Sequence, residues 1–96
     1  MKEEARIETL HPQGKKGVHI LQRRYDVIKS FILDTVAKHQ VISYSDLNDL
    51  AVEQLTETFD GSVAWYVVSV KLDLEARGIL ERVPKTSPHE LRLKKV

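Results

Sequence analysis

Apolar side chains recur at helical spacing along most of the chain after residue 21. Four of them are separated by three and four residues, which places them on one face of a helix: Tyr25, Ile28, Ile32 and Val36. This pattern predicts a first helix from Gln22 to about His39. Val41 and Ile42, which follow it, fit a short strand.

Two further helices are predicted, and each follows residues that can cap a helix. Ser43 with Asp46 resembles a capping box, although Ser45 is a competing cap, and the helix after them is expected to run to about Thr58. Asp60 or Ser62 can cap the third helix, which spans 63–77. Gly78 suits the left-handed residue that ends a helix. Along the third helix, one narrow sector gathers the residues expected to pack inward: Val63, Val67, Val70 and Leu74.

The C-terminal part alternates apolar and polar residues in the way of two strands, 79–83 and 89–93, joined by a turn at 84–88. The order of elements predicts an α+β fold, a winged helix-turn-helix with three helices and a C-terminal β-hairpin wing. The segment HPQGKKG at 11–17 breaks any helix, so residues 1–21 are expected to form an N-terminal arm and residues 22–96 the winged-helix domain.

Two stretches add a resemblance to this fold prediction. LDLEARGILERV at 72–83 is similar to the end of the third helix and the first wing strand of many bacterial winged-helix regulators. HPQGKKGVHI and FDGSVAWYVVSVKLDLEARGILERVP resemble a small bacterial winged-helix family of unknown function, over roughly residues 11–93. The resemblance implies the fold and no particular activity.

Charge is distributed unevenly along the chain. Residues 1–24 contain six basic residues (Lys or Arg) and three acidic ones, for a net charge of +3. Residues 25–78 contain four basic and nine acidic residues (−5), and residues 79–96 contain five basic and two acidic residues (+3). Nucleic-acid affinity follows clusters of Lys and Arg. The basic candidates for phosphate contact lie in the arm and just after it, and on the wing: Lys15, Lys16, Arg23, Arg24, Arg82, Lys85 and Arg92. The alternative for each of them is an ordinary solvated surface.

The third helix carries an apolar stripe on its outer side, where a DNA-reading helix needs donors and acceptors. The stripe consists of Trp65, Val68, Leu72 and Ala76. Ser62 and Ser69 could contact DNA and Lys71 could reach a phosphate, whereas Asp60, Asp73 and Glu75 would face a polyanion. A helix that is apolar on all sides is normally covered on all sides, so we expect the arm or a second subunit to cover the stripe.

The sequence gives little support for catalysis or for metal binding. Cysteine is absent, and the four histidines at 11, 19, 39 and 89 lack metal-ligand spacing. Neither a phosphate-binding loop nor a GxSxG elbow is present. We therefore expect no enzyme activity, no metal and no cofactor. No apolar run approaches the roughly 18 residues of a membrane span, and the first residues do not form a secretory signal, so a cytoplasmic location is expected.

Two functions remain open at this point. The first is a DNA-binding, transcription-regulator-like module that contacts double-stranded DNA weakly or without sequence preference through its basic arm and wing, as a homodimer. The alternative is a protein-interaction domain without nucleic-acid binding, in which the apolar stripe of the third helix makes the dimer contact.

Overall fold

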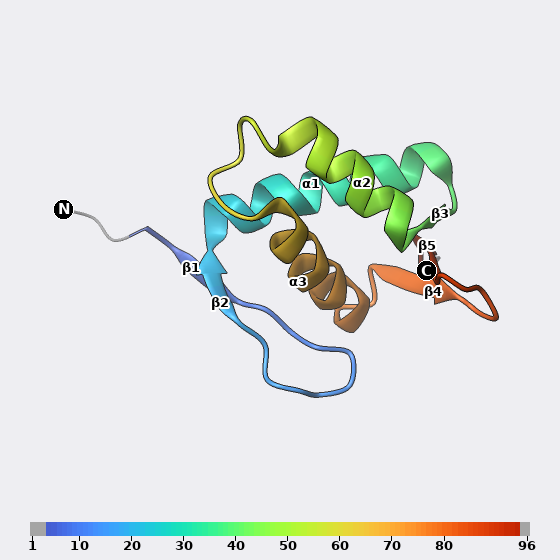
Figure 1. Ribbon diagram of the computed structural model, residues 1–96. Coiled ribbons are helices and arrows are strands. Elements are labelled where there is room, and N and C mark those ends of the chain that lie inside the picture. The colour runs from blue at the N-terminus through green and yellow to red at the C-terminus, as the bar shows by residue number, and fades with distance from the viewer. Residues whose placement is uncertain (1–3, 95–96) are drawn as a thin grey trace.

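The computed structural model describes residues 4–94. Figure 1 shows three helices, with a β-hairpin beside each end of the helical part. The helices are α1 (Gln22–His39), α2 (Tyr44–Leu55) and α3 (Val63–Ala76). The strands are β1 (Arg6–Glu8), β2 (His19–Leu21), β3 (Ile42–Ser43), β4 (Leu80–Val83) and β5 (Glu90–Leu93). The predicted α+β order is confirmed, and three helices with a C-terminal hairpin form a winged-helix-like arrangement.

The core lies between α1, α3 and the wing sheet. The four predicted inward residues of α1 and the four of α3 are all buried. The sheet adds Leu80 and Leu91, which β4 and β5 present on its inner face. The sheet is antiparallel, with the order β3-β5-β4, so the two-residue strand after α1 extends the wing hairpin.

The helix ends follow the capping chemistry of the sequence. The hydroxyl of Ser43 accepts from the backbone N–H of Asp46 at 3.0 Å, which settles the choice of cap for α2. Ser62 caps α3 by accepting from the N–H of Trp65 at 3.4 Å. Gly78 has φ +76°, the left-handed conformation expected where α3 ends. None of the helices described is long and apolar enough to cross a membrane.

The N-terminal arm is a hairpin that packs on the helices. β1 and β2 are antiparallel, and Pro12 and Gly14 lie in the loop that joins them. At the base of this loop, the backbone N–H of Thr9 donates to the carbonyl of Val18 at 2.8 Å. Ile20 of β2 is buried in the same core as α1 and α3. The arm therefore has a fixed position beside α3.

Candidate functional site

The outer stripe of α3, formed by Trp65, Val68, Leu72 and Ala76, is the most exposed apolar part of that helix. Trp65 keeps 44% of its surface exposed, and the other three residues are partly exposed. The indole ring packs edge-on against Tyr66, with 4.9 Å between ring centroids. Tyr66 in turn packs edge-on against Phe59. One side of the indole ring is therefore packed against an aromatic side chain, and the other side is exposed.

The arm and the wing lie on the two sides of α3 (Figure 1). The arm reaches the helix where the N–H of Leu10 donates to Oδ1 of Asp73 at 2.8 Å. The wing reaches it where Nε of Arg82 donates to Oε1 of Glu75 at 2.6 Å. Both contacts use the flanks of α3. The arm, one of the two covers expected for the stripe, leaves Trp65 open.

Asp73 is the centre of a buried polar network. The carboxylate has no exposed surface, although the sequence suggested that it would face outward. It accepts from the hydroxyl of Tyr25 and from Nε of Arg77, in addition to the N–H of Leu10. Burial and the hydrogen bond to Asp73 raise the pKa of Tyr25 to about 12. The expectation of an exposed Asp73 is therefore wrong, because three donors from three segments enclose it.

Lys71 lies inside the protein, on the other flank of α3. Its side chain is 2% exposed, with Nζ 2.9 Å from Oε2 of Glu75 and 3.2 Å from Nε2 of His89. Burial lowers the pKa of Lys71 against the opposing effect of Glu75. Burial alone would raise the pKa of Glu75, but hydrogen bonds from Arg82 and Lys71 outweigh it and hold that pKa below its ordinary value. The prediction that Lys71 reaches a phosphate is corrected, because the ammonium group is enclosed.

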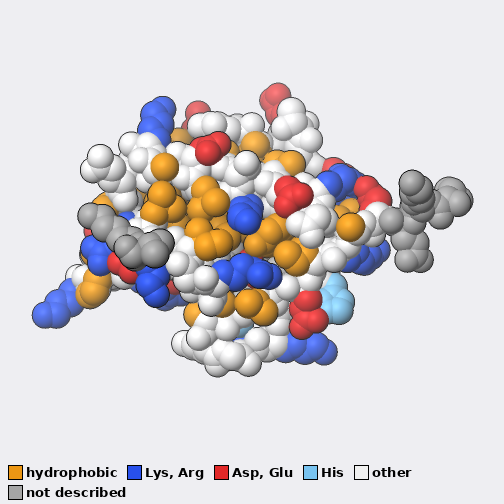
Figure 2. All heavy atoms as spheres, turned by 180° about the vertical axis from the view of Figure 1, so that it is seen from behind, with side chains coloured by type: hydrophobic (Ala, Val, Ile, Leu, Met, Phe, Trp, Pro, Cys, Tyr) orange, Lys and Arg blue, Asp and Glu red, His pale blue; other side chains and the backbone are white. Residues whose placement is uncertain are grey.

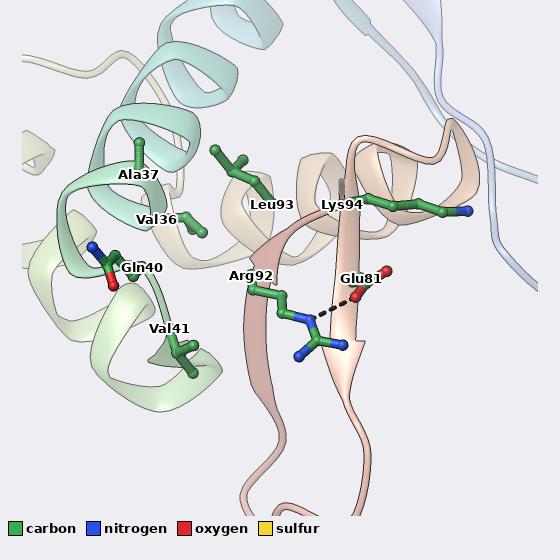
Figure 3. Close-up of a pocket in the computed structure, with 8 residues that line it drawn as sticks. All are labelled: Val36, Ala37, Gln40, Val41, Glu81, Arg92, Leu93 and Lys94. Atoms are coloured by element: carbon green, nitrogen blue, oxygen red, sulfur yellow. Dashed lines mark hydrogen bonds and ion pairs between the residues drawn. The ribbon is translucent and has the colours of Figure 1, made fainter. Parts of the chain in front are cut away.

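All four arginines expected to contact phosphate have carboxylate partners within the chain. Arg23 lies 2.7 Å from Glu4, and Arg24 lies 2.6 Å from Asp60. Hydrogen bonds from Arg24, with its positive charge, lower the pKa of Asp60. Figure 3 shows a similar pair across the outer face of the wing, where Nε of Arg92 donates to Oε2 of Glu81 at 2.6 Å. The positive charges of these arginines, and that of Arg82, are therefore largely balanced by carboxylates of the same chain.

Three basic candidates differ from the rest. Lys15 and Lys16 lie in the arm loop and Lys85 in the wing turn, and all three are exposed. Within residues 4–94 none of them forms an ion pair. Of the two predicted serine contacts, Ser62 is exposed at the start of α3, where its hydroxyl serves as the cap, and Ser69 is partly buried. The unpaired positive charge of the candidate set is therefore confined to two loop tips.

An open groove is another feature of the surface of residues 4–94. It has a volume of about 810 Å3 and lies between the end of α1 and the wing (Figure 3). Val36, Ala37 and Val41 form its apolar side, and the Arg92–Glu81 pair faces them. On the face turned away from the view of Figure 1, apolar side chains gather near the centre, with basic and acidic side chains interspersed (Figure 2). This face presents no continuous positive field that would suit a polyanion.

In the part of the chain that the structure describes, no group of three or more His, Cys, Asp or Glu is placed to hold a metal ion.

The comparison with known families adds one finding. The model of a family of unknown function, DUF6958, matches residues 6–91. The chain belongs to DUF6958. No curated protein and no solved structure matches it. The predicted membership of a family of unknown function is confirmed, and the description of DUF6958 names neither a fold nor an activity.

Proposed function

We propose that this DUF6958 protein is a protein-interaction domain whose contact surface is the outer stripe of α3. The observation that carries the proposal is Trp65, which is 44% exposed on a helix face flanked by other apolar side chains. The open part of a tryptophan corresponds to roughly 100 Å2, and its burial contributes about 2–3 kcal/mol at 25 cal/mol per Å2. Exposed tryptophans with ordered surroundings are typical anchors of protein interfaces.

The polar residues of α3 support the same proposal. A helix that contacts base edges needs Arg, Lys, Asn or Gln on its outward side. In α3 the charged residues Lys71, Asp73 and Glu75 are engaged with the wing and the arm. What remains outward is apolar apart from Ser69, so α3 offers a surface for another protein more readily than for a base pair.

A second copy of the chain is the partner that we propose. Twofold contacts between equivalent patches are the commonest assembly of small domains. An apolar stripe on one helix can pack against the same stripe of another copy without placing unpaired charges in the contact. The partly exposed Val68 and Leu72 would then lie near the middle of that contact.

Sedimentation velocity with matched variants tests this proposal. Wild type is expected to be a dimer, and Trp65→Asp a folded monomer whose unfolding temperature no longer depends on protein concentration. Val27→Asp is the control, since Val27 is 47% exposed but lies on α1. This variant is expected to remain dimeric. A monomeric wild type, or a Trp65→Asp protein that sediments like wild type, would contradict the proposal.

A second candidate function is weak contact with the phosphates of double-stranded DNA. Lys15, Lys16 and Lys85 favour it, because they are exposed without ion-pair partners in the described chain, on the two segments that flank α3. Such contacts give sequence-independent affinity that falls steeply with salt. Light scattering of the protein with random-sequence duplex DNA should then show a complex at low salt that dissociates at moderate salt. A protein indifferent to DNA at low salt excludes this candidate.

A further inference from the structure

A partly buried contact between a lysine and a histidine joins the wing to α3. Nζ of Lys71 lies 3.2 Å from Nε2 of His89, the residue that precedes β5. The same Nζ lies 2.9 Å from a carboxylate oxygen of Glu75. An ammonium group beside a carboxylate can only donate, so Nε2 of His89 is the acceptor. The contact therefore requires the neutral imidazole, with its proton on Nδ1.

His89 also fixes the start of α2. Its ring stacks on Tyr44, with 5.4 Å between centroids and 5° between planes. Its carbonyl accepts from the backbone N–H of Tyr44 at 2.9 Å. One residue of the wing thus holds two helices, and movement of His89 would release both contacts.

The charges around His89 come from each element packed against it. Lys71 and Glu75 belong to α3, Arg82 to β4, and the uncharged Tyr44 to α2. Glu75 is already engaged by both cations, at 2.9 Å and 2.6 Å. Glu90 follows His89 in β5 but lines a surface hollow beside Asp46. A positive charge on His89 would therefore face Lys71 and Arg82 with no uncommitted carboxylate between them.

We propose that the Lys71–His89 contact is a pH-sensitive latch, which holds the wing segment 84–89 against α3 at neutral pH and releases it when His89 is protonated. Protonation removes the acceptor nitrogen and places two cations 3.2 Å apart at a site where the lysine is 2% exposed. This inference does not depend on what the outer stripe of α3 binds.

The direction of the titration follows from the same contacts. Burial, with the nearby charges of Lys71 and Arg82, holds the pKa of His89 below its ordinary value of 6.5. In an open wing the imidazole regains that ordinary pKa. The open form therefore binds the proton more tightly, and the closed form loses stability as the pH falls below 6.5. At pH 5.5 the equilibrium for opening is expected to rise by up to about eightfold relative to neutral pH, the limit reached when the closed form takes up no proton.

Amide hydrogen exchange by NMR on the full chain tests the latch. Two amides report on it directly: the N–H of Tyr44 bonded to His89, and the N–H of Glu90, which donates to Oγ1 of Thr86 at 2.9 Å. Corrected for intrinsic exchange, their protection should fall by up to about eightfold between pH 7 and 5.5. Protection of Ile32 in α1 should stay constant. Protection should begin to fall near pH 6.5, the ordinary pKa that the imidazole regains in the open form.

Two variants complete the experiment. His89→Gln can still accept a hydrogen bond but cannot be protonated, so its Tyr44 and Glu90 amides should keep the same protection at both pH values. His39→Gln, at the exposed end of α1, should behave like wild type. The proposal would be overturned if the protection of the Tyr44 and Glu90 amides in wild type did not change with pH. An equal loss of protection in His89→Gln would overturn it as well. If His89→Gln does not fold, wild type decides, because the protection of the two reporter amides must begin to fall near pH 6.5 while that of Ile32 stays constant.

Discussion

Removal of the Asp73 carboxylate is expected to cause a large loss of stability. Asp73→Ala removes the acceptor of two donors, the buried hydroxyl of Tyr25 and the partly buried N–H of Leu10. Arg77 loses its partner as well, but its side chain is 35% exposed and can turn to water. The variant therefore leaves the arm without its bond to α3 and leaves a tyrosine hydroxyl unsatisfied inside the core.

The magnitude follows from the number of unsatisfied groups. Each buried donor left without an acceptor costs about 1–3 kcal/mol, and removal of one partner from a buried ion pair costs about 3–5 kcal/mol. Because Arg77 can be solvated, the hydroxyl of Tyr25 and the N–H of Leu10 dominate, and we expect a loss of about 4 kcal/mol. A domain of this length has a total stability of roughly 5–14 kcal/mol. Asp73→Ala should therefore retain a stability of about 1–10 kcal/mol.

Urea unfolding followed by far-ultraviolet circular dichroism measures this loss. With a slope near 2 kcal/mol per molar, the midpoint of Asp73→Ala should fall by about 2 M. Asp73→Asn is the matched control, because it keeps the shape and one acceptor oxygen, and we expect about half the loss. A loss below about 1 kcal/mol in Asp73→Ala would refute the reasoning, since it would mean that water or rearrangement satisfies the two donors.

Two further predictions concern the arm hairpin and the core tyrosine. In Gly17→Ala the new Cβ would lie 1.7 Å from the carbonyl oxygen of Thr9, so the hairpin must open at its base, and thermal unfolding should show a loss of at least about 2 kcal/mol. Gly14→Ala is the control, with open space around the Cβ and a cost of about 1 kcal/mol for its positive φ. The pKa of Tyr25, about 12 in the folded protein against 10.0 ordinarily, adds stability that is complete below pH 10 and lost as the pH rises toward 12. Unfolding free energies measured across that range should fall by about 2–3 kcal/mol, and a constant free energy would disprove the assignment.

The apolar framework could be predicted from the sequence because its signal is local. The residues of α1 that form the core repeat every three or four positions, and those of α3 fall in one sector. The caps and the glycine after α3 are also local signals. The arm hairpin could not be predicted, because strands of three residues are too short to show alternation, and the glycines and proline of its loop dominate the pattern.

The polar part of the candidate site depends on contacts between distant segments. Counting charges treats each ionisable side chain as solvated, yet five of the eight basic candidates have a carboxylate partner in the folded chain. Asp73 bonds to Leu10, 63 residues earlier, and Lys71 bonds to His89, 18 residues later. Periodicity along α3 contains no information about these partners. The i,i+4 spacings of Asp73 with Arg77 and of Lys71 with Glu75 were the local signals, and such pairs are commonly exposed.

The two polar networks explain why the outer stripe of α3 is left open. At 100° per residue, Asp73 and Lys71 lie about 160° apart on the inner half of the helix, and Leu72 and Trp65 lie on the opposite side. Asp73 fixes the arm on one flank, while Lys71 and Glu75 fix the wing on the other. These contacts engage the charged side chains of α3. Only apolar residues and Ser69 lie on the surface of α3 between the arm and the wing. A ligand of α3 must therefore fit between two fixed walls and offer an apolar surface, which a helix of another protein does and a DNA backbone does not.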